Sequence, residues 1–271
     1  MKDKVVIITG GSSGIGKALA EEFGKNGSKI LITGRNKIEL DKAVLELKNK
    51  GIQIHGFVAD VILEDENREM ATEALKLFGK IDILINNAGI TMRALFEEVD
   101  MSVVKKVMDI NFYGALYATQ ACLPEITKNK GSVIGISSIA GFRGLPGRTG
   151  YSASKFALNG FLEVLRTEML YRGVHVLTAC PGFTTSNIRN RALTKDGSVQ
   201  GESPRDENKM MTAGQCASHI YNATVKRKNF LVLTTQGKLA VWLNKLFPSL
   251  ADKLVYKAMA KEPNSPLMGK A

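Results

Sequence analysis

A tyrosine and a lysine stand four residues apart in the run Tyr151-Ser-Ala-Ser-Lys155. The run lies in a predicted helix, and residues four apart share a helix face, so the phenol and the ammonium can be neighbours. A free tyrosine has a pKa near ~10, and a neighbouring cation lowers it by favouring the phenolate. Tyr151 would then serve as an acid or base near neutral pH. The same spacing also fits an ordinary helical pair.

Further polar side chains stand where predicted strands end. Ser137-Ser138 closes one strand, and Asn86-Asn87-Ala88-Gly89 closes another. Open α/β sheets bind their ligands at this carboxyl edge, so we expect these residues to face a common site. Asn111 interrupts an otherwise apolar helix and is a candidate for the same site. A buried amide that is satisfied by a neighbouring turn is the alternative for Asn111.

A glycine-rich run, Thr9-Gly-Gly-Ser-Ser-Gly-Ile-Gly16, follows the first predicted strand and opens the first predicted helix. Glycines at 10, 14 and 16 let the backbone turn sharply and approach a ligand. The helix N-terminus then offers free N–H groups to a phosphate. The spacing differs from the common dinucleotide fingerprint, and a simple tight turn is the alternative. The strand before it and the helix after it favour a dinucleotide site.

The residues after the second predicted strand address the choice of dinucleotide. An NAD site places an acidic residue about 20 residues after the glycines, to hold the ribose 2′-hydroxyl. Here Gly34 is followed by Arg35 and Asn36. A guanidinium suits a 2′-phosphate, which a carboxylate would repel. We therefore expect NADP, with NAD less favoured; a solvent-facing arginine is the alternative.

The elements that must position these residues follow from the hydrophobic pattern. Apolar runs that alternate with helices of 12 or more residues indicate βαβ units, and strands that are apolar throughout indicate cover on both faces. We predict an α/β fold, a Rossmann-like doubly wound parallel sheet of about seven strands with helices on both faces. The predicted strands are 5–9, 29–33, 53–58, 81–86, 133–137, 175–179 and 230–234. The predicted helices are 15–26, 37–50, 63–78, 103–126, 151–171 and 212–226.

The chain of 271 residues shows no composition break. We predict one catalytic domain over 1–235, with a substrate loop at about 183–210, and an amphipathic extension of the same domain over 236–271. In that extension apolar residues recur at helical spacing among lysines, and Pro248 divides it into two short helices. A lid, a subunit contact, core packing and peripheral contact with a membrane surface all remain open for it.

Hydropathy, cysteine spacing and net charge exclude several classes of protein. No apolar run reaches the ~18 residues of a membrane span, and the N-terminal run is too short for a signal peptide, so we expect a cytoplasmic protein. Cys122, Cys180 and Cys216 lack metal-binding spacing, and we expect reduced core thiols and no metal. The net charge of +11 is spread along the chain without a nucleic-acid motif. We expect no nucleic-acid partner.

In combination these motifs resemble the short-chain dehydrogenases/reductases, over about residues 4–235. The motifs that carry the resemblance are TGGSSGIG at 9–16, Asp60, NNAG at 86–89, Asn111, Ser138, Tyr151 with Lys155, and Pro181-Gly182. The resemblance implies that Tyr151 donates and accepts the proton and that Ser138 orients and polarises the carbonyl. Lys155 would hold the ribose hydroxyls and lower the pKa of the tyrosine, and Asn111 would support a water relay.

The resemblance also implies the residues that hold the cofactor. These are Gly10, Ser12, Ser13, Gly14, Ile15, Gly16, Arg35, Asn36, Asp60, Val61, Asn87, Ala88, Gly89, Tyr151, Lys155, Pro181, Gly182, Thr184 and Ser186. Thr184 and Ser186 depart from the family pattern of Val or Ile followed by Thr. Many NADP-using members carry a basic residue where this chain has Ser13, so the expected NADP preference depends on Arg35, helped by Asn36.

We therefore expect an NADP(H)-dependent oxidoreductase that reversibly reduces a carbonyl to an alcohol, on a hydrophobic or lipid-like ketone. Residues 188–197 and 237–250 also resemble, more weakly, the branch that contains acyl/alkyl-dihydroxyacetone-phosphate reductase. We expect a homodimer or homotetramer. Two alternatives are a dinucleotide-binding regulator without turnover and an epimerase or dehydratase that uses the same Tyr/Lys pair. The intact catalytic set disfavours the first, and the glycine spacing disfavours the second.

Overall fold

Seven parallel strands form one sheet in the order β3-β2-β1-β4-β5-β6-β7. The computed structural model describes residues 1–204, 206–207 and 210–268. Residues 205, 208 and 209 of the predicted substrate loop, and 269–271 of the predicted extension, lie outside the described residues. The strands are β1 Val5–Ile8, β2 Lys29–Gly34, β3 Ile54–Val58, β4 Ile83–Asn86, β5 Ser132–Ile136, β6 His175–Cys180 and β7 Phe230–Val232. The predicted fold class is confirmed.

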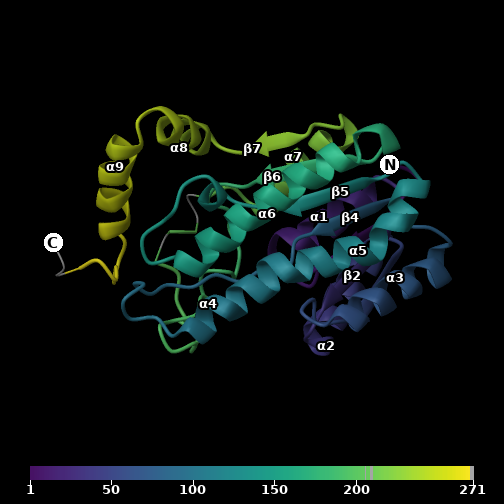
Figure 1. Ribbon diagram of the computed structural model, residues 1–271. Helices are drawn as coiled ribbons and strands as arrows, with labels where there is room; N and C mark the ends of the chain where they lie inside the picture. Colours follow the sequence, from purple (N-terminus) through teal and green to yellow (C-terminus); the bar gives the residue numbers. More distant parts are fainter. Residues whose placement is uncertain (205, 208–209, 269–271) are drawn as a thin grey trace.

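Helices cover both faces of the sheet (Figure 1). The main helices are α1 Gly14–Lys25, α2 Lys37–Lys48, α3 Glu64–Phe78, α4 Met101–Met108, α5 Gly114–Lys128, α6 Thr149–Glu168 and α7 Ala213–Val225. Successive residues of a strand point to opposite faces, which separates the core into two clusters. Val6 and Ile8 of β1 pack with α1, α2 and α7, whereas Ile7 packs with α3, α5 and α6.

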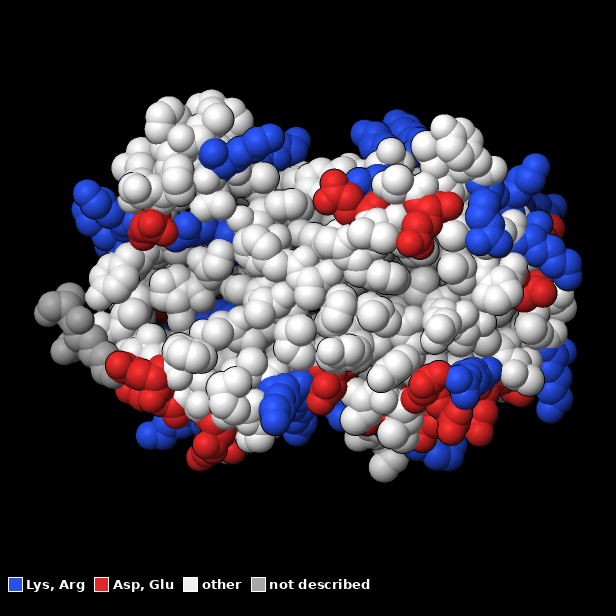
Figure 2. Space-filling model, in the orientation of Figure 1, with Lys and Arg blue, Asp and Glu red and all other residues white. Residues whose placement is uncertain are grey.

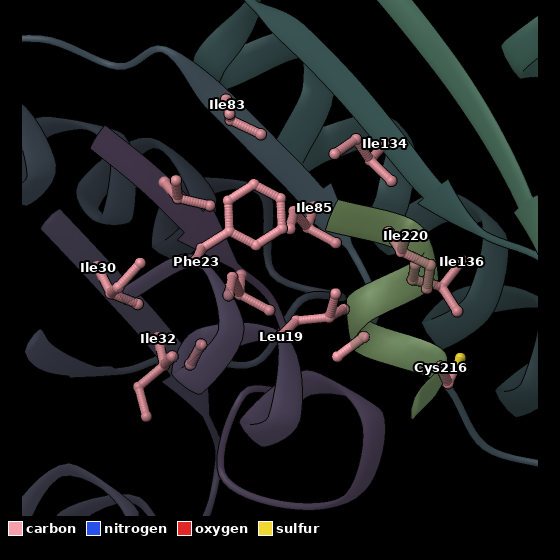
Figure 3. Close-up of a cluster of buried hydrophobic side chains, with 14 of the residues drawn as sticks. Leu19, Phe23, Ile30, Ile32, Ile83, Ile85, Ile134, Ile136, Cys216 and Ile220 are labelled. Carbon is pink, nitrogen blue, oxygen red and sulfur yellow. The ribbon is translucent and has the colours of Figure 1, made fainter. Parts of the chain in front are cut away.

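Side chains of α1 and α7 pack on one face of the sheet and cover it (Figure 3). Phe23 of α1 and Ile220 of α7 are fully buried and lie against isoleucines of β2, β4 and β5. Burial on both faces explains the continuous apolar runs of the strands. Among the described residues, no helix is both long and apolar enough to cross a membrane.

The predicted helix over 103–126 is interrupted. The run from Met101 to Lys128 consists of α4, a π-helical turn over Asp109–Tyr113, and α5. A π-turn inserts one residue into the helix and re-aims the side chains that follow, often at functional sites. Asn111 lies inside this turn, so the polar residue that breaks the apolar pattern also marks the change of helix geometry.

The chain after β7 forms two helices, α8 Thr235–Leu246 and α9 Pro248–Ala260, and Pro248 is the first residue of the second. The predicted strand over 230–234 is two residues too long. Thr234 adopts φ +70°, and its hydroxyl caps α8 by accepting from Gly237 N, so the chain leaves the sheet there. Arg143 ties both helices to the body by donating to Asn244 Oδ1 at 2.9 Å and to Asp252 Oδ1 at 2.5 Å.

Candidate active site

A cavity of about 1300 Å³ opens at the carboxyl ends of the central strands. It exceeds the ~300–1,000 Å³ usual for a small-molecule site, and it has room for a dinucleotide together with a second ligand. All of the site residues predicted from sequence line this cavity, apart from Gly16 and Asn111. Gly16 and Asn111 lie directly behind its wall, where they hold other lining residues.

The glycine-rich turn forms one end of the cavity. Gly10 has φ +63°, and a Cβ placed there would lie 2.9 Å from Ala88 Cα, so only glycine lets the two loops meet. Asn87 Nδ2 donates to Thr9 O at 2.9 Å and to Gly10 O at 3.0 Å. A Cβ at Gly16 would lie 2.4 Å from that same Nδ2. The glycines therefore let the turn pack closely against the loop after β4. We call this turn at the N-terminus of α1 the glycine-rich cradle, because a helix N-terminus of this kind suits a pyrophosphate.

Thr9 joins the turn to β4 and was not identified as a site residue from sequence. Its Oγ1 accepts from the backbone N–H groups of Asn87 and Ala88, at 3.1 Å each. The side chain is buried, and it fixes the loop that carries the predicted NNAG motif. Thr9 is the first residue of the glycine-rich run, and that position was the sequence signal from which its role could have been predicted.

Arg35, Asn36 and Asp60 lie together where β2 and β3 end. Arg35 Nη1 is 3.5 Å from Asp60 Oδ2, and the arginine side chain remains half-exposed. The Asn36 side chain accepts from Glu39 N and caps α2. Thr33, at the same edge of the cavity, is buried, and among the described residues its Oγ1 has no hydrogen-bond partner. A polar atom left unsatisfied in a cavity wall is suited to a ligand.

Asn111 is fully buried and holds the loop after β4. Its Oδ1 accepts from Ile90 N at 2.8 Å, and its Nδ2 donates to Ile90 O at 2.9 Å and to Ser154 Oγ at 2.9 Å. A Cβ at Gly89 would lie 3.2 Å from Asn111 Oδ1 and 3.6 Å from Lys155 Nζ. The amide thus braces the cavity wall between the loop and α6. Its partner Ser154 directly precedes Lys155 and lies about one helical turn from Tyr151.

Tyr151 and Ser138 face each other across the cavity. Ser138 follows β5 and caps a short 3₁₀ turn over Ile139–Gly141, because its Oγ accepts from Ala140 N at 3.1 Å. Tyr151 also lines the cavity, and the Ser138 side chain is close enough to its hydroxyl to lower the pKa of the phenol. One helical turn further along α6, Lys155 Nζ donates to Ile136 O at 2.8 Å and lies 5.8 Å from the centre of the Tyr151 ring.

The electrostatics of the pair differ from the sequence-based expectation. Burial raises the pKa of Tyr151, and the Ser138 hydrogen bond and the charges of Arg148 and Arg189 oppose that rise without reversing it. Burial also lowers the pKa of Lys155 to about 8. In this geometry desolvation of the phenolate outweighs the groups that lower the pKa of Tyr151, and the lowering expected from Lys155 stays a prediction.

The chain after β6 closes the cavity over the glycine-rich turn. The buried Thr184 donates to Gly182 O at 3.2 Å. Ser186 lies next to Gly14, since a Cβ added to that glycine would be 3.3 Å from Ser186 Cβ. Arg189 fixes this segment through two hydrogen bonds to Glu207, at 2.7 and 2.6 Å, and one to Thr184 O at 2.7 Å. Ser186 therefore lies within reach of a ligand in the phosphate cradle, where the sequence placed it.

The rest of the cavity lining combines apolar and basic residues that carry no sequence motif. The apolar ones are Ile110, Leu145, Leu193, Val199, Val255 and Met259, and the basic ones include Arg143, Arg148 and Arg189. Arg148 precedes Tyr151 by three residues, is buried, and donates to Met92 O at 3.0 Å. Its Nη2 lies 3.4 Å from Glu262 Oε2. Glu262 is 114 residues away in the sequence, so no sequence pattern predicts this contact.

Comparison with known proteins agrees with this site. The family model of the short chain dehydrogenases matches residues 4–197. The chain belongs to the short-chain dehydrogenase/reductase family, a family of oxidoreductases, as the sequence motifs predicted. It is 34% identical over 271 residues to the mouse protein "Dehydrogenase/reductase SDR family member 7B", covering 98% of this chain and 84% of that protein.

Two solved structures are similar to this fold. One is a short-chain dehydrogenase/reductase from Burkholderia phymatum in complex with NAD, with a TM-score of 0.82, 24% identity, and coverage of 92% of this chain and 95% of that one. The other is a variant of the actinorhodin polyketide ketoreductase with NADPH, with a TM-score of 0.66, 28% identity, and coverage of 68% and 71%. Proteins of similar fold thus include complexes with NAD and with NADPH.

Proposed function

We propose that the protein is an NADPH-dependent reductase that converts a hydrophobic or lipid-like ketone to the corresponding alcohol. The observation that carries the proposal is that Tyr151 and Ser138 line the same cavity as Lys155 and the glycine-rich cradle. A carbonyl oxygen placed between these two hydroxyls would lie in the same cavity as a cofactor seated on the cradle.

The proposed mechanism assigns one task to each side chain. When bound, the cofactor supplies a hydride to the carbonyl carbon. The Ser138 hydroxyl donates to the carbonyl oxygen and orients it, and the Tyr151 phenol transfers its proton to that oxygen. Burial keeps Tyr151 protonated at neutral pH, which is the state that reduction requires. Lys155 would hold the ribose hydroxyls, and Asn111 holds the loop that borders Lys155.

NADP is the proposed cofactor, in preference to NAD. Arg35 is the half-exposed cation at the edge of β2, where a 2′-phosphate would lie, and a guanidinium can bind that phosphate through two hydrogen bonds. In this proposal the phosphate competes with Asp60 for the arginine. Glu39, which lines the same part of the cavity, is the acidic residue that opposes this preference.

The proposed substrate class rests on the apolar part of the cavity lining. Its apolar side chains suit a long or branched hydrocarbon, and apolar ligands gain free energy as they leave water. The weaker sequence resemblance to acyl/alkyl-dihydroxyacetone-phosphate reductases is consistent with a lipid-like ketone. We propose that the reaction runs in the reductive direction, because cells use NADPH mainly as a hydride donor.

The test is oxidation of NADPH against a panel of carbonyl compounds that runs from small diketones through aryl ketones to long-chain 3-ketones and acyl-dihydroxyacetone phosphate. The proposal predicts turnover with the larger apolar members and its loss in Tyr151→Phe. NADPH binding without reduction of any member would favour the dinucleotide-binding regulator. Product formation without net NADPH consumption would favour the epimerase or dehydratase.

We also propose a cytoplasmic homo-oligomer. Tyr113, Phe156 and Val164 expose 44–57% of their surface on the π-turn and on α6, and their burial against a second subunit would be favourable. Analytical ultracentrifugation tests this. A monomer at micromolar concentration would overturn it.

A further inference from the structure

The two C-terminal helices carry an exposed apolar surface. We define the α8–α9 face as Leu239, Trp242, Leu246, Phe247, Leu250 and Leu254, each of which exposes 47–59% of its surface. Leu239, Trp242 and Leu246 recur at the spacing of one helix stripe, and the Trp242 and Phe247 rings lie 6.3 Å apart, edge to face. Exposed apolar clusters of this kind mark an interaction site.

Cations border this face. Lys238, Lys245, Lys253 and Lys257 are all exposed, and within the described part of the chain none of them forms a salt bridge. At the upper left of Figure 2, where α8 and α9 lie, blue side chains lie below the white surface and to its right, and red covers a smaller area. The face is therefore apolar at its centre and positively charged at its rim.

The acidic residues of the same segment, Asp252 and Glu262, pair with arginines of the protein body. Asp252 pairs with Arg143 at 2.5 Å, and Glu262 lies 3.4 Å from Arg148 and 3.7 Å from Arg93. Glu262 is buried in this position. Glu262 is thus sequestered in the body, whereas Asp252 stays 66% exposed although it pairs with Arg143, so the lysines outnumber the one exposed carboxylate among the described residues of the segment.

The opposite side of these helices belongs to the cavity. Ala240 of α8 and Val255 and Met259 of α9 line the same cavity as Tyr151. In Figure 1 the two helices lie at the end of the molecule far from the N-terminus, outside the sheet. A single layer of helices therefore separates the apolar face from the proposed substrate site.

We propose that the α8–α9 face docks onto an anionic lipid surface, with its apolar side chains at the headgroup boundary and its lysines on the headgroups. A tryptophan among aliphatic side chains, with a lysine rim, is the composition of interfacial helices. A second copy of this chain is a poorer occupant, since a two-fold contact through this face would bring the lysines of both copies together. Docking would place the cavity beside the membrane, which supplies a lipid-like ketone directly; this last consequence rests on the proposed function.

Trp242 makes the test direct, because it is the only tryptophan in the chain. Its fluorescence is recorded as the full chain is titrated with phosphatidylcholine vesicles, with and without phosphatidylserine. The proposal predicts a blue shift, and quenching by brominated acyl chains, with the anionic vesicles. The variant Lys245→Glu/Lys253→Glu should bind them about 25-fold or more weakly, since each lysine near an anionic surface strengthens binding about fivefold.

The matched control is Lys42→Glu/Lys48→Glu, which reverses two exposed charges on α2 and should bind as the unmodified chain does. Thermal unfolding of both variants verifies that they fold. A Trp242 spectrum that does not respond to anionic vesicles would overturn the proposal. A blue shift that depends on protein concentration without lipid would also overturn it and would assign the face to a second copy. Neither readout requires turnover, so failure here is distinct from failure of the proposed reaction.

Discussion

Lys155 Nζ lies 5.8 Å from the centre of the Tyr151 ring, and its hydrogen bond goes to the carbonyl of Ile136. The ammonium is thus anchored to the end of β5, beside the ring of the tyrosine. In this arrangement burial governs both groups: it raises the pKa of Tyr151 and lowers the pKa of Lys155 to about 8. Burial thus keeps the phenol protonated, which is the state that the proposed donor role requires.

The first prediction concerns the pH dependence of the reductive reaction. Tyr151 stays protonated across neutral pH, whereas Lys155 loses its charge above about pH 8. We expect kcat/KM to be flat near neutral pH and to fall above about pH 8, as the lysine loses the proton with which it binds and orients its partners. Lys155→Arg keeps a charge and should have a lower plateau without that fall. A profile of the unmodified enzyme that stays flat to about pH 10 would contradict this assignment.

A second prediction concerns the stability cost of the buried lysine. Below about pH 8 the lysine is protonated in the folded and unfolded states, and the folded state bears the full cost of the buried charge. Between that pH and the ordinary lysine value of 10.5, the unfolded chain binds more protons, so stability rises with pH. Lys155→Met should therefore be inactive, yet raise the melting temperature near neutral pH by about 2–4 °C or more.

The gain from Lys155→Met should shrink as the pH approaches 10.5, because the unmodified chain loses its penalty there. Differential scanning calorimetry over this pH range measures the difference. A gain of constant size would show that packing, and not charge, is responsible, and a lower melting temperature at neutral pH would contradict the sign.

The third prediction separates the bracing role of Asn111 from general stability. Asn111→Ala leaves the N–H and C=O of Ile90 without their partner, at a cost of about 1–3 kcal/mol for each buried group. We expect a lower free energy of unfolding and a large loss of kcat. Asn129→Ala is the control, since Asn129 donates to Ile81 O at 3.0 Å, far from the cavity, and its loss should affect stability alone. Equal effects of both variants on kcat would argue against the role of Asn111.

The fourth prediction addresses cofactor choice. Arg35→Ala should weaken NADPH binding roughly 10- to 100-fold and leave NADH binding nearly unchanged. The factor corresponds to the free energy of one hydrogen bond to a charged group. Lys37→Ala, two residues along, removes an exposed cation that is paired with Asp41 and should change neither affinity. Isothermal titration with both dinucleotides measures this. Equal weakening of NADPH and NADH would show that Arg35 does not read the 2′-phosphate.

The sequence was sufficient for the fold because its signals are local and repeated. The alternation of apolar strands with long helices predicted the sheet, and the glycine-rich run predicted the turn after β1. The π-turn at Asp109–Tyr113 escaped, because a single inserted residue leaves the apolar periodicity almost unchanged. The early end of β7 escaped as well, since it depends on the φ of Thr234.

The parts of the site that escaped prediction depend on distant contacts. Arg148 is held by Met92 O and by Glu262, from segments 56 and 114 residues away, and no local pattern signals either partner. The direction of the Tyr151 pKa also depended on burial, which spacing along a helix does not reveal. Residues with a motif were found, and residues defined only by their surroundings were not.

The central claim is that Tyr151 gives its proton to a carbonyl that receives a hydride from NADPH. The most direct measurement is a single-turnover reaction with NADPH deuterated at the transferable position, with analysis of the product by mass spectrometry. The account predicts deuterium on the carbinol carbon with the unmodified enzyme, and no alcohol with Tyr151→Phe, although that variant still binds NADPH. Alcohol without deuterium, or labelled alcohol formed equally fast by Tyr151→Phe, would contradict it.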